Sequence, residues 1–194
     1  MLTEFLSLAL ANSLLILGMF FFVWVLSIML RDSSIADILW GLGFVIVAWF
    51  TWSVADGVEA RQLLVAVLTT IWGVRLSAYI AWRNWGAEDP RYARLRQHVE
   101  SQGKNYALHS LINVYLVQAI FMCITSLVLV FAMTVDTPEE LGWLAWLGTA
   151  LWVIGMLFEI VGDAQLARFR AEPANKGKVL DRGLWKYTRH PNYF

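Results

Sequence analysis

The stretch FLSLALANSLLILGMFFFVWVLSIML, residues 5–30, contains no Asp, Glu, Lys or Arg over 26 consecutive positions. A helix of this length would rise about 39 Å, whereas the hydrocarbon core of a bilayer is about 30 Å thick. The run is too long for the hydrophobic segment of a secretory signal peptide, and no basic residue precedes it. It therefore predicts a helix that spans a membrane.

Four more apolar runs follow, and together they predict an all-α, polytopic integral membrane bundle. They cover residues 35–55, 63–82, 109–135 and 143–160. Backbone polar groups cannot bond to water inside a bilayer, so each run is predicted to be a helix. Composition agrees, because 59% of the residues are hydrophobic and only 15% are charged, against about 25% charged in soluble domains. We predict one membrane domain covering residues 1–194.

The basic residues predict which way the spans run. Thirteen of the fifteen Lys and Arg residues follow the first, third and fifth spans, which alternation places on one side. Basic loops favour the cytoplasm. We therefore expect an N-terminus outside and a cytoplasmic segment at residues 163–194, as in a multi-pass protein of the bacterial inner membrane. The formal net charge of zero provides no basic field that would favour nucleic acid as a partner.

Cysteine and histidine predict neither a disulfide nor a metal site. Cys123, the one cysteine, lies in an apolar run and is interpreted as a small core side chain. His98, His109 and His190 lie far apart, without the spacing of metal ligands.

A polar segment between the third and fourth spans contains DPRYARLR at residues 89–96. As a helix, it would place Tyr92, Leu95 and Val99 on one face and Arg91 and Arg94 on another. Two interpretations are open. The helix lies at the membrane interface with its basic groups near lipid headgroups, or one arginine closes over a ligand that carries phosphate.

Charged residues inside the apolar runs are costly and indicate function or pairing. Arg75 and Glu159 would lie at similar depths, about 12 Å and about 13 Å from the cytoplasmic ends of their spans. They would form an ion pair that fixes helix register, or one or both would face a ligand cavity. Asp37 and Asp163 are the other charged residues in or beside the spans.

Glycines predict where helices approach closely. On the fifth span Gly148, Gly155 and Gly162 recur every seven residues and share a face with Glu159 and Asp163. Small residues let helices pack closely in lipid, so this face is predicted to look into the bundle beside a polar cavity. The pairs Trp40-Gly41 and Trp72-Gly73 are interpreted as a helix crossing.

The closing residues WKYTRHPNYF, 185–194, gather hydrogen-bond donors at Lys186, Tyr187, Arg189, His190 and Asn192. Pro191 suits the first position of a helix. A helix beginning there would direct free N–H groups at an anion beside Arg189 and His190. This stretch predicts an anion-binding site.

The closing stretch GLWKYTRHPNYF, residues 183–194, resembles the C-terminal motif of the steroid 5α-reductase-like membrane proteins, above all a bacterial branch of unknown function. Shorter pieces resemble the same branch, namely DILWG at 37–41, WGVRL at 72–76, EDPRY at 88–92 and EIVGDAQ at 159–165. The resemblance covers about residues 35–194.

The resemblance implies NADPH bound from the cytoplasmic side and hydride transfer to a carbon–carbon double bond of a steroid or other lipid-like substrate. By their place in the motifs, the implied cofactor-binding residues are Asp163, Arg189, His190, Asn192 and Tyr193. No Gly-x-Gly-x-x-Gly fingerprint is present, so a Rossmann sheet is not expected. The family has about seven spans, so one or two helices would follow Phe194, and we expect these 194 residues alone to bind cofactor poorly and to be inactive.

Reduction also needs a group that stabilises the enolate that forms on hydride transfer. Tyr193, Glu159 and Arg75 are the candidate catalytic residues, and Tyr187 is a further candidate. The acid pair that polarises the substrate in steroid 5α-reductases has no match here, and Asp37 and Arg75 are replacements by location alone.

Two alternatives are open. The Arg-His-Pro-x-Tyr core also resembles the isoprenylcysteine and phospholipid methyltransferases, which implies S-adenosylmethionine as the cofactor. The other alternative is a non-enzymatic membrane binding or scaffold protein whose buried charges only fix helix register. That alternative predicts no cofactor-sized cavity near Arg189.

Overall fold

The computed structural model describes residues 2–193 as helices and loops, with no strand in that range. Five helices are long and apolar enough to cross a membrane: α1 (Leu2–Leu30), α2 (Ile35–Val54), α3 (Glu59–Arg83), the continuous helix Tyr106–Thr134 and α7 (Trp143–Ala171). The predicted all-α fold with five spans is confirmed. The fifth span runs on as a polar helix and ends just before Pro173, also as predicted.

The chain divides into two compact units, Met1–Glu140 and Leu141–Phe194. The first unit contains α1, α2, α3 and α4 (Pro90–Ser101). It also contains the fourth span, built from α5 (Tyr106–Ser110), the π-helical turn η1 (Leu111–Leu116) and α6 (Val117–Thr134). The second unit contains α7 and the 3₁₀ turns η2 (Pro173–Asn175), η3 (Gly183–Lys186) and η4 (Pro191–Tyr193). That both units act as one membrane domain stays a prediction.

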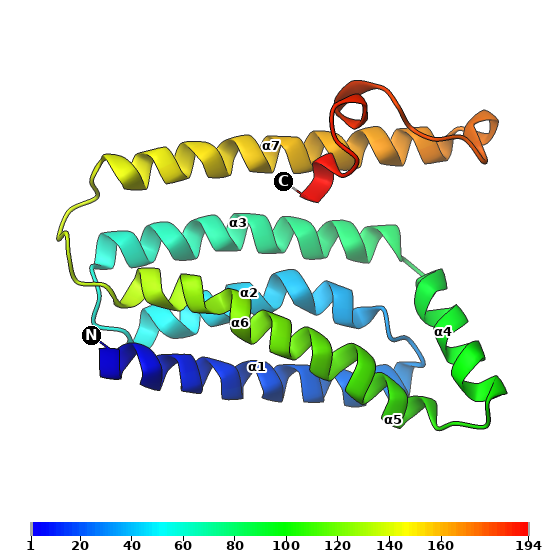
Figure 1. Cartoon of the computed structure of the whole chain (residues 1–194), viewed down its shortest axis with the longest axis horizontal. Coiled ribbons are helices and arrows are strands. Elements are labelled where there is room, and N and C mark those ends of the chain that lie inside the picture. The colour runs from blue at the N-terminus through cyan, green and yellow to red at the C-terminus, as the bar shows by residue number, and fades with distance from the viewer. Residues whose placement is uncertain (1, 194) are drawn as a thin grey trace. The chain divides into compact units, whose positions relative to one another are not determined.

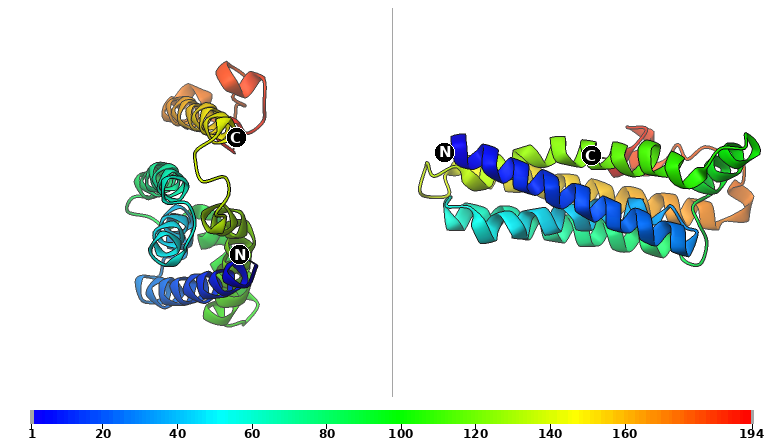
Figure 2. Two further views of the ribbon diagram at one scale, coloured as in Figure 1. Left: turned by 90° about the vertical axis from the view of Figure 1, so that its left-hand side faces the viewer. Right: turned by 90° about the horizontal axis from the view of Figure 1, so that it is seen from below.

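In the first unit α1, α2, α3 and α6 run side by side and alternate in direction, and α2 contacts the other three (Figures 1 and 2). Helix α4 lies across the end of this bundle where α1 and α3 end and α2 begins (Figure 1). The alternation predicted from the apolar runs is confirmed within this unit.

The first unit places large apolar side chains on its outside and small polar ones inside. Phe22 and Val128 are 68% and 75% exposed, whereas Asn12 and Thr51 are buried. The Asn12 amide donates a hydrogen bond to the Thr51 hydroxyl at 2.9 Å and so links α1 to α2. Lipid solvates an apolar exterior and leaves polar groups to pair inside. The chain is therefore a multi-pass membrane protein in contact with the bilayer.

Helices α2 and α3 approach so closely that neither Gly41 nor Gly73 has room for a side chain. A Cβ at Gly41 would lie 2.4 Å from the Gly73 carbonyl oxygen, and a Cβ at Gly73 would lie 2.5 Å from the Gly41 carbonyl oxygen. Beside them Phe44 packs against Trp40 and Trp72, with ring centroids 5.7 Å apart in both pairs. The predicted crossing of the two Trp-Gly pairs is confirmed.

Helix α4 is held against the start of α2 by Asp37. Arg91 donates from Nη2 to Asp37 Oδ2 at 2.8 Å, and the Tyr92 hydroxyl donates to Asp37 Oδ1 at 2.7 Å. Burial and the neighbouring Asp37 charge raise the pKa of Tyr92 above its ordinary value. Asp37 is thus a partnered residue in the first turn of α2.

The predicted faces of α4 are confirmed. Tyr92 and Leu95 pack against the core of the first unit, and Val99 is buried. Arg91 is held by two carboxylates, those of Asp37 and Asp89. Both interpretations of the α4 arginines, headgroup contact and closure over a ligand, stay predictions.

Asp89 caps α4 and pairs with the same arginine. Its carboxylate accepts hydrogen bonds from the Arg91 backbone N–H at 2.9 Å and from Arg91 Nε at 3.0 Å. The side-chain hydrogen bond from Arg91 is the largest effect on the pKa of Asp89, which lies below its ordinary value although burial opposes the shift. A depressed carboxyl pKa stabilises the fold above the unfolded-state pKa, and this stabilisation is lost as pH falls through the folded-state value.

We expect Asp89→Asn to lower the free energy of unfolding by about 1–2 kcal/mol at pH 7, because it removes the charge from a buried cap. The difference from the unsubstituted protein should shrink as pH falls below the ordinary carboxyl pKa of about 4 and on through the lower pKa of folded Asp89. Thermal unfolding in detergent between pH 7 and pH 3 measures both effects. The exposed Asp136 serves as the control, as Asp136→Asn. A difference that persists unchanged to pH 3 would contradict the ion pair.

Candidate functional site

The segment that follows α7 folds back along the same helix (Figure 1). Three hydrogen bonds fasten it there, from the Trp185 indole to the Gly162 carbonyl at 3.1 Å, from the Leu184 backbone N–H to Gln165 Oε1 at 3.0 Å, and from the Asn192 amide to Asp163 Oδ1 at 3.0 Å. The closing motif is therefore an ordered part of the second unit, placed against the polar extension of α7.

Glycine allows this close approach. A Cβ at Gly162 would lie 3.1 Å from the Asn192 backbone nitrogen and 3.2 Å from Pro191 Cγ. At Gly148 a Cβ would meet no atom within 4 Å in the described part of the chain. The small-residue face of α7 was predicted to pack against another helix. At Gly162 it packs instead against the closing segment of the same chain.

Pro191 begins a turn, as predicted, but the described part of that turn, η4, is a three-residue 3₁₀ element. Pro191 is buried, and the Tyr193 backbone N–H donates to the His190 carbonyl at 3.1 Å. The Asn192 backbone nitrogen lies close to Gly162 of α7. Among residues 191–193, the Tyr193 donor is used within the turn and the Asn192 nitrogen lies against α7, so the side chains are the main candidates for binding an anion.

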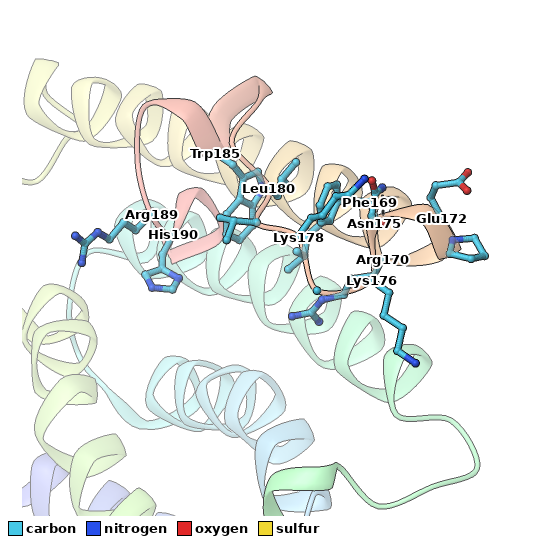
Figure 3. A pocket seen from close by; sticks show the side chains of 14 residues that line it. Phe169, Arg170, Glu172, Asn175, Lys176, Lys178, Leu180, Trp185, Arg189 and His190 are labelled. Atoms are coloured by element: carbon cyan, nitrogen blue, oxygen red, sulfur yellow. Dashed lines mark hydrogen bonds between the residues drawn. The ribbon is translucent and has the colours of Figure 1, made fainter.

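A cavity of about 700 Å³ lies between the end of α7 and the closing segment (Figure 3). Four cationic side chains line it, Arg170, Lys176, Lys178 and Arg189, against one carboxylate, Glu172. The rings of Phe169, Trp185 and His190 also line it. The volume falls in the range of about 300–1,000 Å³ that is typical of small-molecule sites. Such a cavity beside Arg189 is not what the scaffold alternative predicts.

The cationic groups gather at two ends of this cavity. Figure 3 shows Arg189 and His190 at one end and Arg170 and Lys176 at the other, with Trp185 between them. An elongated anionic molecule with two charged parts would match this distribution.

The predicted cofactor-binding residues fall into two groups. Arg189 and His190 line the cavity, and Tyr193 stacks on His190 with ring centroids 5.3 Å apart and planes at 25°. Asp163 is 6% exposed and bonds to Asn192, and neither of these two residues lines this cavity. Direct contact of Asp163, Asn192 and Tyr193 with a cofactor stays a prediction.

The candidate catalytic residues are spread over both units. Glu159 lies on α7, one turn before Asp163, whereas Arg75 lies on α3 in the first unit. Their pairing and their access to a cavity stay predictions. Tyr193 and Tyr187 are 79% and 82% exposed.

The sequence did not single out Arg170, Lys176 or Lys178 as site residues. Their positions in the chain indicate only the orientation of the spans. A signal was present, because a Lys-Gly-Lys turn lies shortly after Pro173. Only the tertiary structure, in which the closing segment turns back along α7, shows that these cations line the same cavity as Arg189.

A comparison with protein families finds one match. A family model described as a protein of unknown function (DUF1295) matches residues 23–194, which include every residue that lines the cavity. No curated protein and no solved structure matches the chain. The chain therefore belongs to the DUF1295 family of proteins of unknown function.

Proposed function

We propose that this protein is a membrane reductase that uses NADPH to reduce a carbon–carbon double bond in a steroid or other lipid-like substrate. The observation that carries the proposal is the charge of the cavity, which has four cations and one carboxylate beside the Arg-His-Pro-Asn-Tyr motif. NADPH bears a diphosphate and a 2′-phosphate, and arginine and lysine are the side chains that bind such groups.

The same charge disfavours S-adenosylmethionine. That cofactor carries a positive sulfonium and a zwitterionic amino acid, so four cations would repel it and a single carboxylate would not compensate. The aromatic lining of Phe169, Trp185 and His190 suits the flat rings of either cofactor. Electrostatics and not shape therefore favours NADPH.

Asn192 gives further support. Its amide nitrogen is bonded to Asp163, and its Oδ1 atom is buried with no hydrogen-bond partner among residues 2–193. A buried acceptor without a donor is uncommon in native proteins. We propose that the nicotinamide end of the cofactor extends beyond the described cavity toward Asn192, where its carboxamide N–H would satisfy this acceptor.

The reaction divides between cofactor and protein. The dihydronicotinamide, when bound, supplies the hydride. The residues of this chain would hold the phosphates at Arg189 and at the cations near the end of α7, orient the ring near Asn192, and supply a proton. Tyr193 and Glu159 are the proposed proton donors, and Arg75 is the proposed group that stabilises the enolate. We further propose that residues 163–194 face the cytoplasm, where NADPH is available.

Titration of the complete gene product in detergent tests the proposal. We expect saturable binding of NADPH and none of S-adenosylmethionine, with NADPH oxidation when a sterol that carries an unsaturated ketone is added. Binding of S-adenosylmethionine alone would favour the methyltransferase, and binding of neither cofactor would leave the scaffold interpretation.

A further inference from the structure

Residues 175–178 form an ordered turn that places two lysines at the cavity. Lys176 has φ −57° and ψ 124°, Gly177 has φ +79°, and the Lys178 N–H donates to the Asn175 carbonyl at 2.9 Å. These values match a type II β-turn, whose third residue needs a positive φ and is therefore usually glycine. Gly177 thus determines the directions in which the flanking lysines leave the backbone.

The turn is fastened to the end of α7. The Asn175 side-chain amide donates to the Phe169 carbonyl at 2.9 Å, and the Asn175 backbone N–H donates to the Glu172 carbonyl at 3.0 Å. The Lys176 N–H donates to the Pro173 carbonyl at 3.2 Å. A turn held by these bonds loses little further conformational freedom when a ligand binds.

Three cationic side chains that follow one another closely in the chain line the cavity, and we name them the basic cluster: Arg170, Lys176 and Lys178. Figure 3 shows the carboxylate of Glu172 extending away from the ammonium of Lys176. Arg189 lies at the opposite end of the cavity. The basic cluster is therefore separate from the motif cation, and the two can bind different anionic groups of one molecule.

We infer that the basic cluster binds a phosphate monoester, the 2′-phosphate of the nucleotide, and thereby selects NADPH over NADH. The inference rests on the proposed function. A phosphate monoester carries a charge of about −1.5 to −2 at pH 7, which suits a cavity that these three cations line. The 2′-hydroxyl of NADH is neutral and would gain nothing from them. Arg189 would serve the diphosphate that both nucleotides share.

The test compares dissociation constants for NADPH and NADH in the complete gene product, reconstituted in neutral phosphatidylcholine nanodiscs. Lys176→Ala and Lys178→Ala should each weaken NADPH binding about tenfold, as expected for one charge-assisted hydrogen bond. NADH binding should stay within about twofold, since the changed groups do not contact it. Lys104→Ala is the control, because Lys104 is exposed in the first unit and does not line the cavity.

Gly177→Ala tests the turn without changing a charge. A positive φ is strained for alanine, so the lysines should shift and NADPH binding should weaken while NADH binding does not. Gly103 is the control, because it also has a positive φ, +69°, and lies in the first unit, where a Cβ would meet no described atom within 4 Å. Gly103→Ala should leave both affinities unchanged.

Several outcomes would overturn the inference. Equal affinity of the unsubstituted protein for NADPH and NADH would overturn it and leave the reductase proposal in place, as would equal losses for both nucleotides in the lysine variants. If the lysines instead bind a lipid phosphate, the variants would lose affinity for phosphatidylglycerol and keep their NADPH affinity. Failure of the unsubstituted protein to bind either nucleotide would overturn the inference and the proposed function together.

Discussion

Gly41→Ala is expected to destabilise the first unit by about 3 kcal/mol or more, because the added methyl group has no space. It would lie 2.4 Å from the Gly73 carbonyl oxygen and 2.5 Å from Ser77 Oγ. The carbonyl belongs to the backbone of α3, so relief requires the two helices to move apart and to lose the packing around Phe44. Thermal unfolding and size-exclusion chromatography in detergent measure the loss.

Gly18→Ala is the matched control for this substitution. Gly18 lies within α1 in the same unit, and a Cβ there would meet no described atom within 4 Å. Alanine is the better helix former by about 0.5–1 kcal/mol, so this variant should be as stable as the unsubstituted protein or slightly more so. If the two variants behave alike, α2 and α3 do not cross as closely as described.

Arg189→Ala is expected to weaken NADPH binding by about 100-fold, the effect of losing two charge-assisted hydrogen bonds of an arginine to phosphate. Arg189 lines the cavity, whereas Arg94 lies exposed on α4 and donates from Nε to the Pro90 carbonyl at 3.0 Å. Arg94→Ala should therefore leave binding within about twofold, since it removes no cavity cation. Equilibrium titration of the complete gene product measures both.

The pattern across nucleotides makes the Arg189 prediction sharper. Because Arg189 is assigned to the diphosphate, Arg189→Ala should weaken NADPH and NADH binding by similar factors, unlike the Lys176 and Lys178 variants. Arg189→Lys keeps the charge but loses the bidentate geometry, so it should fall between arginine and alanine. Equal losses for Arg189→Ala and Arg94→Ala would mean that the phosphates bind elsewhere.

The helices of this protein could be predicted from its sequence because a bilayer imposes one simple requirement. A segment in lipid must have an apolar exterior and must form its backbone hydrogen bonds within itself. A long uncharged run such as residues 5–30 therefore has to become a helix, as it does in α1. The end of α7 just before Pro173 and the buried face of α4 at Val99 follow from equally local rules.

The candidate site could be predicted only in part. Arg189 and His190 were found because their motif is contiguous in sequence and its donor side chains suit an anion. The partners of Asp37 could not be predicted, since Arg91 and Tyr92 are more than fifty residues away in the sequence. Local pattern carries no information about which distant group will neutralise a charge.

By itself, the sequence determined that the chain is a helical membrane protein with a cluster of hydrogen-bond donors in its closing motif. The tertiary structure alone decided that α2 and α3 meet backbone to backbone at Gly41 and Gly73. It also decided that Lys176 and Lys178 share a cavity with Arg189. Both results depend on how separate segments pack against each other at a turn or a helix crossing. Distances of a few ångströms decide which groups come into contact there, and the periodicity of the sequence does not contain those distances.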